Sequence, residues 1–149
     1  MPQTFTQLHF HIVFSTKRRT PTITMELRER LYDYLGGIVR SLSGTSLGIG
    51  GADDHVHLFV SIPQTLSVAD FVRTVKTNSS AWIHKTWPQV EFVWQTGYAA
   101  FTVSHSAIST VQTYIADQER HHRKRTFQDE LRLLLTKHGL EPDERYMWE

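Results

Sequence analysis

The chain has 149 residues, no cysteine and a formal net charge of +1, and its hydrophobic content is ordinary for a globular protein. This length predicts one domain covering residues 1–149, with enough chain to bury a core. Without cysteine there are no disulfides or thiolate metal sites, so a metal would need histidine, carboxylate or amide ligands. No apolar run approaches the roughly 18 residues of a membrane span, and the first residues lack the pattern of a signal peptide. We therefore expect a cytoplasmic protein with no membrane partner.

The hydrophobic patterning predicts four strands and four helices. Runs rich in aromatic and β-branched residues predict strands, and apolar residues three and four apart predict helices. Ser67 and Thr126 are suitable helix N-caps, and Gly139 is a suitable helix terminator. In chain order, we expect a strand over 5–16, a helix over 24–42, strands over 45–52 and 55–63, a helix over 67–87, a strand over 91–104, and helices over 106–123 and 126–140.

This order, β-α-β-β-α-β followed by two C-terminal helices, is typical of one α+β architecture. It is the ferredoxin-like split βαβ fold, in which helices cover one face of an antiparallel sheet. We therefore expect such a sheet with helices on one face, extended by the two C-terminal helices.

Two histidines open the strand expected over 55–63. His55 and His57 are two residues apart, so in a strand their side chains point to the same face, about 7 Å apart along the chain. Two imidazoles so placed can bind a metal ion. His9 and His11 have the same spacing in the first strand, so the residues alone leave two candidate pairs, and either pair could instead be hydrogen-bonded within the sheet.

A tyrosine and a glutamine occupy one face of the helix expected over 106–123. Tyr114 and Gln118 are four residues apart, so they are neighbours on the helix surface. Gln118 can offer an amide oxygen to a cation, and Tyr114 would then lie one turn away from that ion. His121 and His122 follow; they could face the same site or belong to a basic surface, and we favour the surface.

Joined in this order, the motifs resemble the single-tyrosine HUH transposases of the smallest bacterial insertion sequences, the insertion sequence 200/605 family. The stretch "DDHVHLFVSIP" (53–63) resembles the family's histidine-hydrophobe-histidine strand, and "YIADQERHHRKRTFQDEL" (114–131) resembles its tyrosine helix. "IVFSTKRR", "VWQTGYAAFTVS" and "LEPDERYMWE" resemble its first strand, its fourth strand and its C-terminal end, so the likeness covers nearly the whole chain. Asp117 departs from the asparagine expected before the glutamine.

The resemblance implies a role for each motif. Tyr114 would be the nucleophile, with His55, His57 and Gln118 holding Mg²⁺ or Mn²⁺, and His11 would be a supporting residue. The activity implied is cleavage and rejoining of single-stranded DNA with hairpin ends through a 5′-phosphotyrosine. The resemblance also implies a homodimer in which Tyr114 of one subunit completes the site of the other.

The remaining aromatic and basic residues have less specific roles. Tyr32, Tyr34 and Tyr146 are expected to be structural, Tyr98 to be in the core or to line the site, and Trp82, Trp87 and Trp94 to be in the core rather than stacked on bases. Two basic clusters are candidates for DNA backbone contact: Lys17, Arg18 and Arg19, and Arg123, Lys124 and Arg125.

Two other classes of protein remain open from the residues. A ferredoxin-like sheet can bind single-stranded nucleic acid through aromatic residues on its face, which would require neither a metal nor Tyr114. A metal-dependent hydrolase would use His55, His57 and Gln118 to activate water, again without Tyr114. Replacement of Tyr114 distinguishes these classes from the transposase.

Overall fold

The computed structural model describes residues 3–145, 147 and 148, and it contains a four-stranded antiparallel sheet. The strands are β1 (His9–Ser15), β2 (Thr45–Gly51), β3 (His55–Ser61) and β4 (Ala99–Thr102), in the spatial order β2-β3-β1-β4. β1 and β3 are the two central strands, and they pair over their full lengths, from His9 opposite Ser61 to Ser15 opposite His55. This order is that of the split βαβ fold, so the expected fold class is confirmed.

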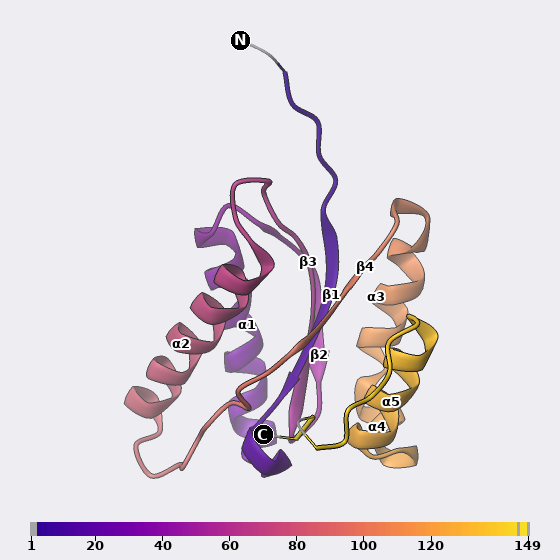
Figure 1. Ribbon diagram of the computed structural model, residues 1–149. Helices are drawn as coiled ribbons and strands as arrows, with labels where there is room; N and C mark the ends of the chain where they lie inside the picture. The colour runs from indigo at the N-terminus through magenta and orange to yellow at the C-terminus, as the bar shows by residue number, and fades with distance from the viewer. Residues whose placement is uncertain (1–2, 146, 149) are drawn as a thin grey trace.

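Helices cover both faces of this sheet (Figure 1). On one face lie α1 (Met25–Ser41) and α2 (Val68–Thr86), which connect the strands. On the other face lie three helices after the last strand: α3 (Ile108–Ala116), α4 (Gln118–Lys124) and α5 (Phe127–Lys137). Short 3₁₀ turns occupy Lys17–Arg19 and His105–Ala107. In the described part of the chain, no helix combines the length and the apolar character needed to cross a membrane.

The two faces of the sheet bury different kinds of side chain. Alternate residues of the central strands, such as Ile12, Phe14 and Leu58, join the apolar core beneath α1 and α2. Their neighbours point the other way, and they include His11 and His57, whose rings are in contact. Because both faces are covered, the central strands are buried nearly throughout, and the polar residues on the second face must find partners inside the protein.

Side-chain caps place the helix ends where the sequence predicts them. The hydroxyl oxygen of Ser67 accepts a hydrogen bond from the backbone N–H of Asp70, and that of Thr126 accepts one from Asp129. Gly139 has a φ of +73°, the left-handed conformation that favours glycine just after a helix.

Two expected elements differ from those observed. The strand expected over 91–104 is regular only in β4. The preceding segment meets the end of β1 in an isolated bridge between Thr16 and Trp94, and there Gln95 Oε1 takes the place of a backbone acceptor for the N–H of Ser15 at 2.8 Å. The helix expected over 106–123 is interrupted at Asp117, which separates α3 from α4. The direction of the chain therefore changes at Asp117, immediately before Gln118.

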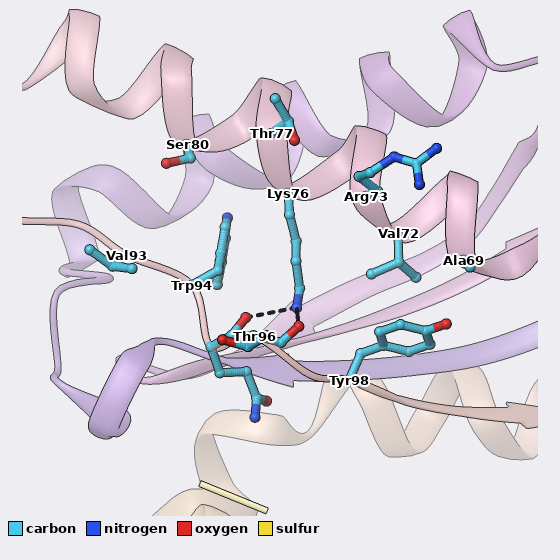
Figure 2. Close-up of a pocket in the computed structure, with 11 residues that line it drawn as sticks. Ala69, Val72, Arg73, Lys76, Thr77, Ser80, Val93, Trp94, Thr96 and Tyr98 are labelled. Carbon is cyan, nitrogen blue, oxygen red and sulfur yellow. Dashed lines mark hydrogen bonds between the residues drawn. The ribbon is translucent and has the colours of Figure 1, made fainter. Parts of the chain in front are cut away.

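A half-buried lysine fixes the irregular segment before β4. Lys76 of α2 donates hydrogen bonds to the backbone carbonyls of Gln95 and Thr96 at 2.8 and 3.3 Å (Figure 2). It also donates one to the carbonyl of Gly97 at 2.5 Å. Burial lowers the pKa of the Lys76 ammonium to about 8. These three carbonyls are therefore paired with a side chain rather than with a neighbouring strand, which explains why the regular strand begins only at Ala99.

We predict that Lys76→Ala lowers the free energy of unfolding by about 1–3 kcal/mol, because it leaves several backbone carbonyls without their donor. Urea titration of the variant measures this loss. Lys85→Ala is the matched control, since Lys85 is exposed in the last turn of the same helix and should change stability by less than about 0.5 kcal/mol. Equal stability of the two variants would show that the lysine does not hold the segment.

Candidate metal centre and active site

β3 carries the two histidines into the protein interior. His55 and His57 are both fully buried, on the face of the sheet that α3, α4 and α5 cover. Each ring has a partner on its Nδ1 atom: Asp54 Oδ1 lies 2.8 Å from His55 Nδ1, and His11 Nε2 lies 2.7 Å from His57 Nδ1. These contacts orient both rings so that their Nε2 atoms are turned toward the C-terminal helices.

Glycines before the histidine strand permit close packing around it. A Cβ atom on Gly51 would lie 2.2 Å from the backbone oxygen of His55 across the tight β2–β3 turn. A Cβ on Gly50 would lie 2.5 Å from the backbone oxygen of Ile115 in α3. Glycine at these positions therefore allows the turn to form and α3 to pack directly on β2.

Gln118 meets His55 as the sequence predicts. Its side chain is buried at the start of α4, and its Oε1 lies 3.0 Å from His55 Nε2. The nearby Arg28 of α1 pairs with Glu119 at 2.5 Å, and this contact anchors the first turn of α4. The structure thus brings together His55, His57 and Gln118 from two elements that are 61 or more residues apart in the chain.

Glu130 is the site residue that sequence reasoning missed. It lies on α5 with its carboxylate buried, and Oε1 is 2.7 Å from His57 Nε2 and 3.7 Å from His55 Nε2. A signal was present in the sequence, because Glu130 interrupts the apolar stripe formed by Phe127, Leu131 and Leu134. A carboxylate in a buried stripe requires a polar partner.

The donor set fits a divalent cation. Asp54 Oδ1 lies against His55 Nδ1, and the Gln118 amide oxygen lies 3.0 Å from His55 Nε2. The Glu130 carboxylate lies 2.7 Å from His57 Nε2. Imidazole nitrogens are ligands of transition-metal ions, whereas amide and carboxylate oxygens suit Mg²⁺ and Mn²⁺, so this mixed set can hold a divalent ion. In the described residues, His55, His57 and Glu130 form one group able to hold a metal ion.

The titration of this cluster favours a neutral imidazole beside a charged carboxylate. Burial lowers the pKa of His57, although the hydrogen bond to Glu130 opposes the shift. Burial by itself raises the pKa of Glu130, but the hydrogen bond from His57 and the neighbouring rings outweigh it, so the pKa of Glu130 is lowered. The carboxylate is therefore ionised at neutral pH and available to a cation.

Tyr114 lies beside the two histidines in the same chain. Its ring centroid is 5.8 Å from that of His57, and Tyr114 and Glu130 line one hollow together. Burial, reinforced by the negative charge of Glu130, raises the pKa of Tyr114. The phenol is thus neutral in the metal-free protein, and a positive charge would have to be added before it could act as a nucleophile.

His121 and His122 contact the site, so their expected place on a purely basic surface is wrong. The ring of His121 stacks on Tyr114 with centroids 5.0 Å apart. His122 Nε2 lies 3.1 Å from Asp53 Oδ1, and its ring is 5.5 Å from that of His55. The turn of helix after Gln118 rotates both rings toward the sheet, which helical spacing alone leaves undecided.

Both basic clusters lie near the end of the sheet at which β3 begins, and all their residues are exposed except Arg19, which is half-buried. The backbone N–H groups of Thr16 and Ile23, which flank Lys17–Arg19, donate to the carbonyls of Asp54 and Asp53 respectively. The same turn is held by His122 of α4, the helix that leads into the second cluster. A hollow beside Tyr114 is lined by His121, Lys124, Arg125 and Glu130 together with Tyr114.

The other aromatic candidates lie elsewhere. Tyr98 and Trp94 line a pocket against α2, on the face of the sheet opposite the histidines (Figure 2). Tyr34 stacks on Trp82, which also meets Trp87 edge-on, and these rings pack against the core beneath α1 and α2. Tyr32 is also packed against this core, and Tyr146 lies outside the described residues. Trp82, Trp87 and Trp94 are thus in or against the core, as expected.

Comparison with known proteins gives the family. The model of the family "Transposase IS200 like" matches residues 4–118, most of the chain. The ISDra2 transposase TnpA of Deinococcus radiodurans is 27% identical over 118 residues, which cover 75% of this chain and 84% of that protein. The protein is therefore a transposase, and it belongs to the IS200-like family.

Two solved structures share the fold. A Deinococcus radiodurans R1 protein has a TM-score of 0.64 at 23% identity, covering 79% of this chain and 95% of that one. A REP-associated tyrosine transposase bound to a REP hairpin has a TM-score of 0.61 at 14% identity, covering 100% of this chain and 90% of that one.

We predict that the metal-free protein loses stability when the pH falls below about 6.5. Burial, followed by the neighbouring His57, lowers the pKa of His11 to about 2, whereas the unfolded chain binds that proton near 6.5. Between these values the unfolded state holds more protons, so acid favours unfolding by about 1.4 kcal/mol per pH unit for this group.

Urea unfolding with chelator at pH 7.5 and pH 5.0 measures this effect, and His11 alone should contribute about 2 kcal/mol to the difference. In His11→Gln the difference between the two pH values should shrink by that amount. Replacement of the exposed His105 by Asn should leave the difference as in the parent protein. An unchanged difference in His11→Gln would contradict the burial of a neutral imidazole at this position.

Proposed function

We propose that this transposase cleaves and rejoins single-stranded DNA through a 5′-phosphotyrosine on Tyr114, in a reaction that depends on a divalent metal ion. The observation that carries the proposal is the place of Tyr114, whose ring lies 5.8 Å from that of the buried His57 and which lines a hollow together with Glu130. Among the described tyrosines, it is Tyr114 that has a ring contact with one of the two site histidines.

His55, His57 and Gln118 would hold Mg²⁺ or Mn²⁺, since the two rings lie side by side and the Gln118 amide oxygen is 3.0 Å from His55 Nε2. A bound divalent ion stabilises negative charge on a phenol oxygen and polarises a phosphoryl oxygen. The stabilisation that the ion must provide is substantial, because removing a proton from an ordinary tyrosine costs roughly 4 kcal/mol at pH 7. His57 meets the ring of Tyr114 edge-on, and His121 covers one face of it.

The covalent step exchanges one phosphodiester for another. The Tyr114 oxygen loses its proton and forms a bond to phosphorus, while the bond from phosphorus to the 3′ oxygen breaks and that oxygen leaves as a 3′-hydroxyl after taking up a proton. The phosphate stays on the 5′ side of the cut, joined to Tyr114. Attack by a 3′-hydroxyl on this linkage reverses the step, so no nucleotide cofactor is needed.

The DNA would approach along the two basic clusters. Lys17, Arg18 and Arg19 and also Arg123, Lys124 and Arg125 flank the entry of β3, and Lys124 and Arg125 line the hollow beside Tyr114. Basic side chains so arranged suit a phosphate backbone. The relative bound to a REP hairpin supports single-stranded DNA with hairpin ends as the substrate of this chain. Excision needs two cuts and the chain has one such tyrosine, which favours a homodimer.

Neither alternative class explains the whole site. A nucleic-acid-binding module of this fold uses an open sheet face, but helices lie over both faces here. A metal-dependent hydrolase would use the same ligands and leave Tyr114 without a role. The position of Tyr114 beside His57, in a hollow that Glu130 also lines, favours the tyrosine nucleophile.

We predict that the protein incubated with labelled single-stranded element ends and Mg²⁺ or Mn²⁺ forms a covalent adduct that survives a denaturing gel. Tyr114→Phe should abolish the adduct, because the ring remains but the attacking oxygen is lost. His57→Ala should abolish it too while leaving DNA binding largely intact, since backbone contacts do not pass through the ion. Tyr98→Phe is the matched control and should retain the adduct. An adduct in Tyr114→Phe would refute the assignment, and strand cleavage without any adduct would favour the hydrolase.

A mixed dimer of one His57→Ala chain and one Tyr114→Phe chain shows whether subunits exchange their tyrosine helices. The family resemblance implies exchange, whereas in the single chain α3 packs closely on its own β2 and Tyr114 lies against its own His57. With helices in this position each site lacks one essential group, so we expect the mixed dimer to be inactive. Exchange would leave one site intact, and activity near half of the parent dimer would then be observed under independence of the sites.

A further inference from the structure

We propose that Glu130 is a ligand of the same divalent ion, so that the metal centre has two imidazoles, an amide and a carboxylate. This inference rests on the proposed function and adds a residue to its site. Glu130 lies on α5, beyond residues 4–118 that match the family model. The match to the family model therefore does not include Glu130, and the contacts of this residue in the structure indicate its role.

The position of Glu130 is that of a ligand. Its Oε1 lies 2.7 and 3.7 Å from the Nε2 atoms of His57 and His55, and one donor atom from each of these three residues falls within 4.8 Å of the other two. Gln118 Oε1 approaches the same His55 nitrogen at 3.0 Å. Four donor atoms from three separate elements thus converge on one small volume.

The surroundings of α5 hold the carboxylate in place. Phe127 is buried and its ring stacks on His55 with centroids 4.5 Å apart, and Leu131 is buried in the small apolar cluster on this face of the sheet. Thr126 caps the helix by accepting a hydrogen bond from the backbone of Asp129. Glu130 lies between these anchored residues, so its side chain enters the site from a rigid turn of helix.

Glu130 would be the negatively charged ligand of the centre. His55, His57 and Gln118 are neutral ligands, so without Glu130 the inner set would carry no negative charge to attract a divalent ion. Glu130 is 3% exposed, and within the described residues no lysine or arginine forms an ion pair with it. A buried carboxylate without a cationic partner is costly, and a metal ion held by the adjacent imidazoles would provide that partner.

Two lesser roles for Glu130 predict different results. If Glu130 only accepts the proton of Tyr114, then its removal should slow cleavage and leave metal affinity unchanged. If it only orients His57 by a hydrogen bond, then glutamine, whose amide oxygen can also accept that bond, should preserve metal affinity. A ligand role requires the charged oxygen, and glutamine should then fail.

The test is a titration of the protein with Mn²⁺ in the absence of DNA. Electron paramagnetic resonance measures the concentration of free Mn²⁺ at each step, which gives the affinity. Glu130→Gln should weaken Mn²⁺ binding by at least about tenfold, the lower bound for loss of an oriented metal-site residue. Asp129→Asn is the matched control, because it removes an exposed carboxylate one residue away on the same helix and should leave the affinity unchanged. Circular dichroism confirms folding, and Glu130→Ala serves as a second variant if glutamine is not tolerated.

The outcomes separate this inference from the proposed function. Weak binding in both His57→Ala and the Glu130 variant, with normal binding in Asp129→Asn, supports the four-ligand centre. Normal binding in Glu130→Gln together with weak binding in His57→Ala overturns the role of Glu130 and leaves the proposed metal site standing. Absence of Mn²⁺ binding by the parent protein overturns both.

Discussion

The burial of two imidazoles between a sheet and its C-terminal helices is the constraint on which this site depends. His55 and His57 are removed from water, so each ring nitrogen needs a partner within the protein. Asp54 and His11 supply partners on one side of the rings, and the side chains of α4 and α5 converge on the other. The same contacts that satisfy the buried polar groups therefore bring the candidate nucleophile and the candidate ligands together.

The two faces of the sheet divide the work of the protein. One face packs an apolar core against α1 and α2, where Lys76 fixes the irregular approach to β4. The other face combines a smaller apolar cluster, which includes Phe101, Phe127 and Leu131, with the polar contacts of the two histidines.

The sequence by itself determined the order of the strands and helices, and it determined which residues share a face of one strand or helix. Period-two and helical patterns specify β-α-β-β-α-β, because side-chain burial on a strand and on a helix depends on local spacing. His55 and His57 share a face for the same reason, and Tyr114 and Gln118 are neighbours because they lie one helical turn apart. The family resemblance favours the pair His55 and His57 over the pair His9 and His11. In the structure, His11 Nε2 lies 2.7 Å from His57 Nδ1.

Tertiary structure alone decided the rest. Glu130 reaches the histidines from a helix 73 residues beyond His57, and no local pattern encodes the distance between them. The break at Asp117, the rotation of His121 and His122 into the site and the docking of α3 at Gly50 likewise arise from packing between elements. Sequence periodicity indicates which face of its own strand or helix a residue occupies. The contacts between faces of different elements depend on how those elements pack. This site is formed by such contacts, between β3, α4 and α5.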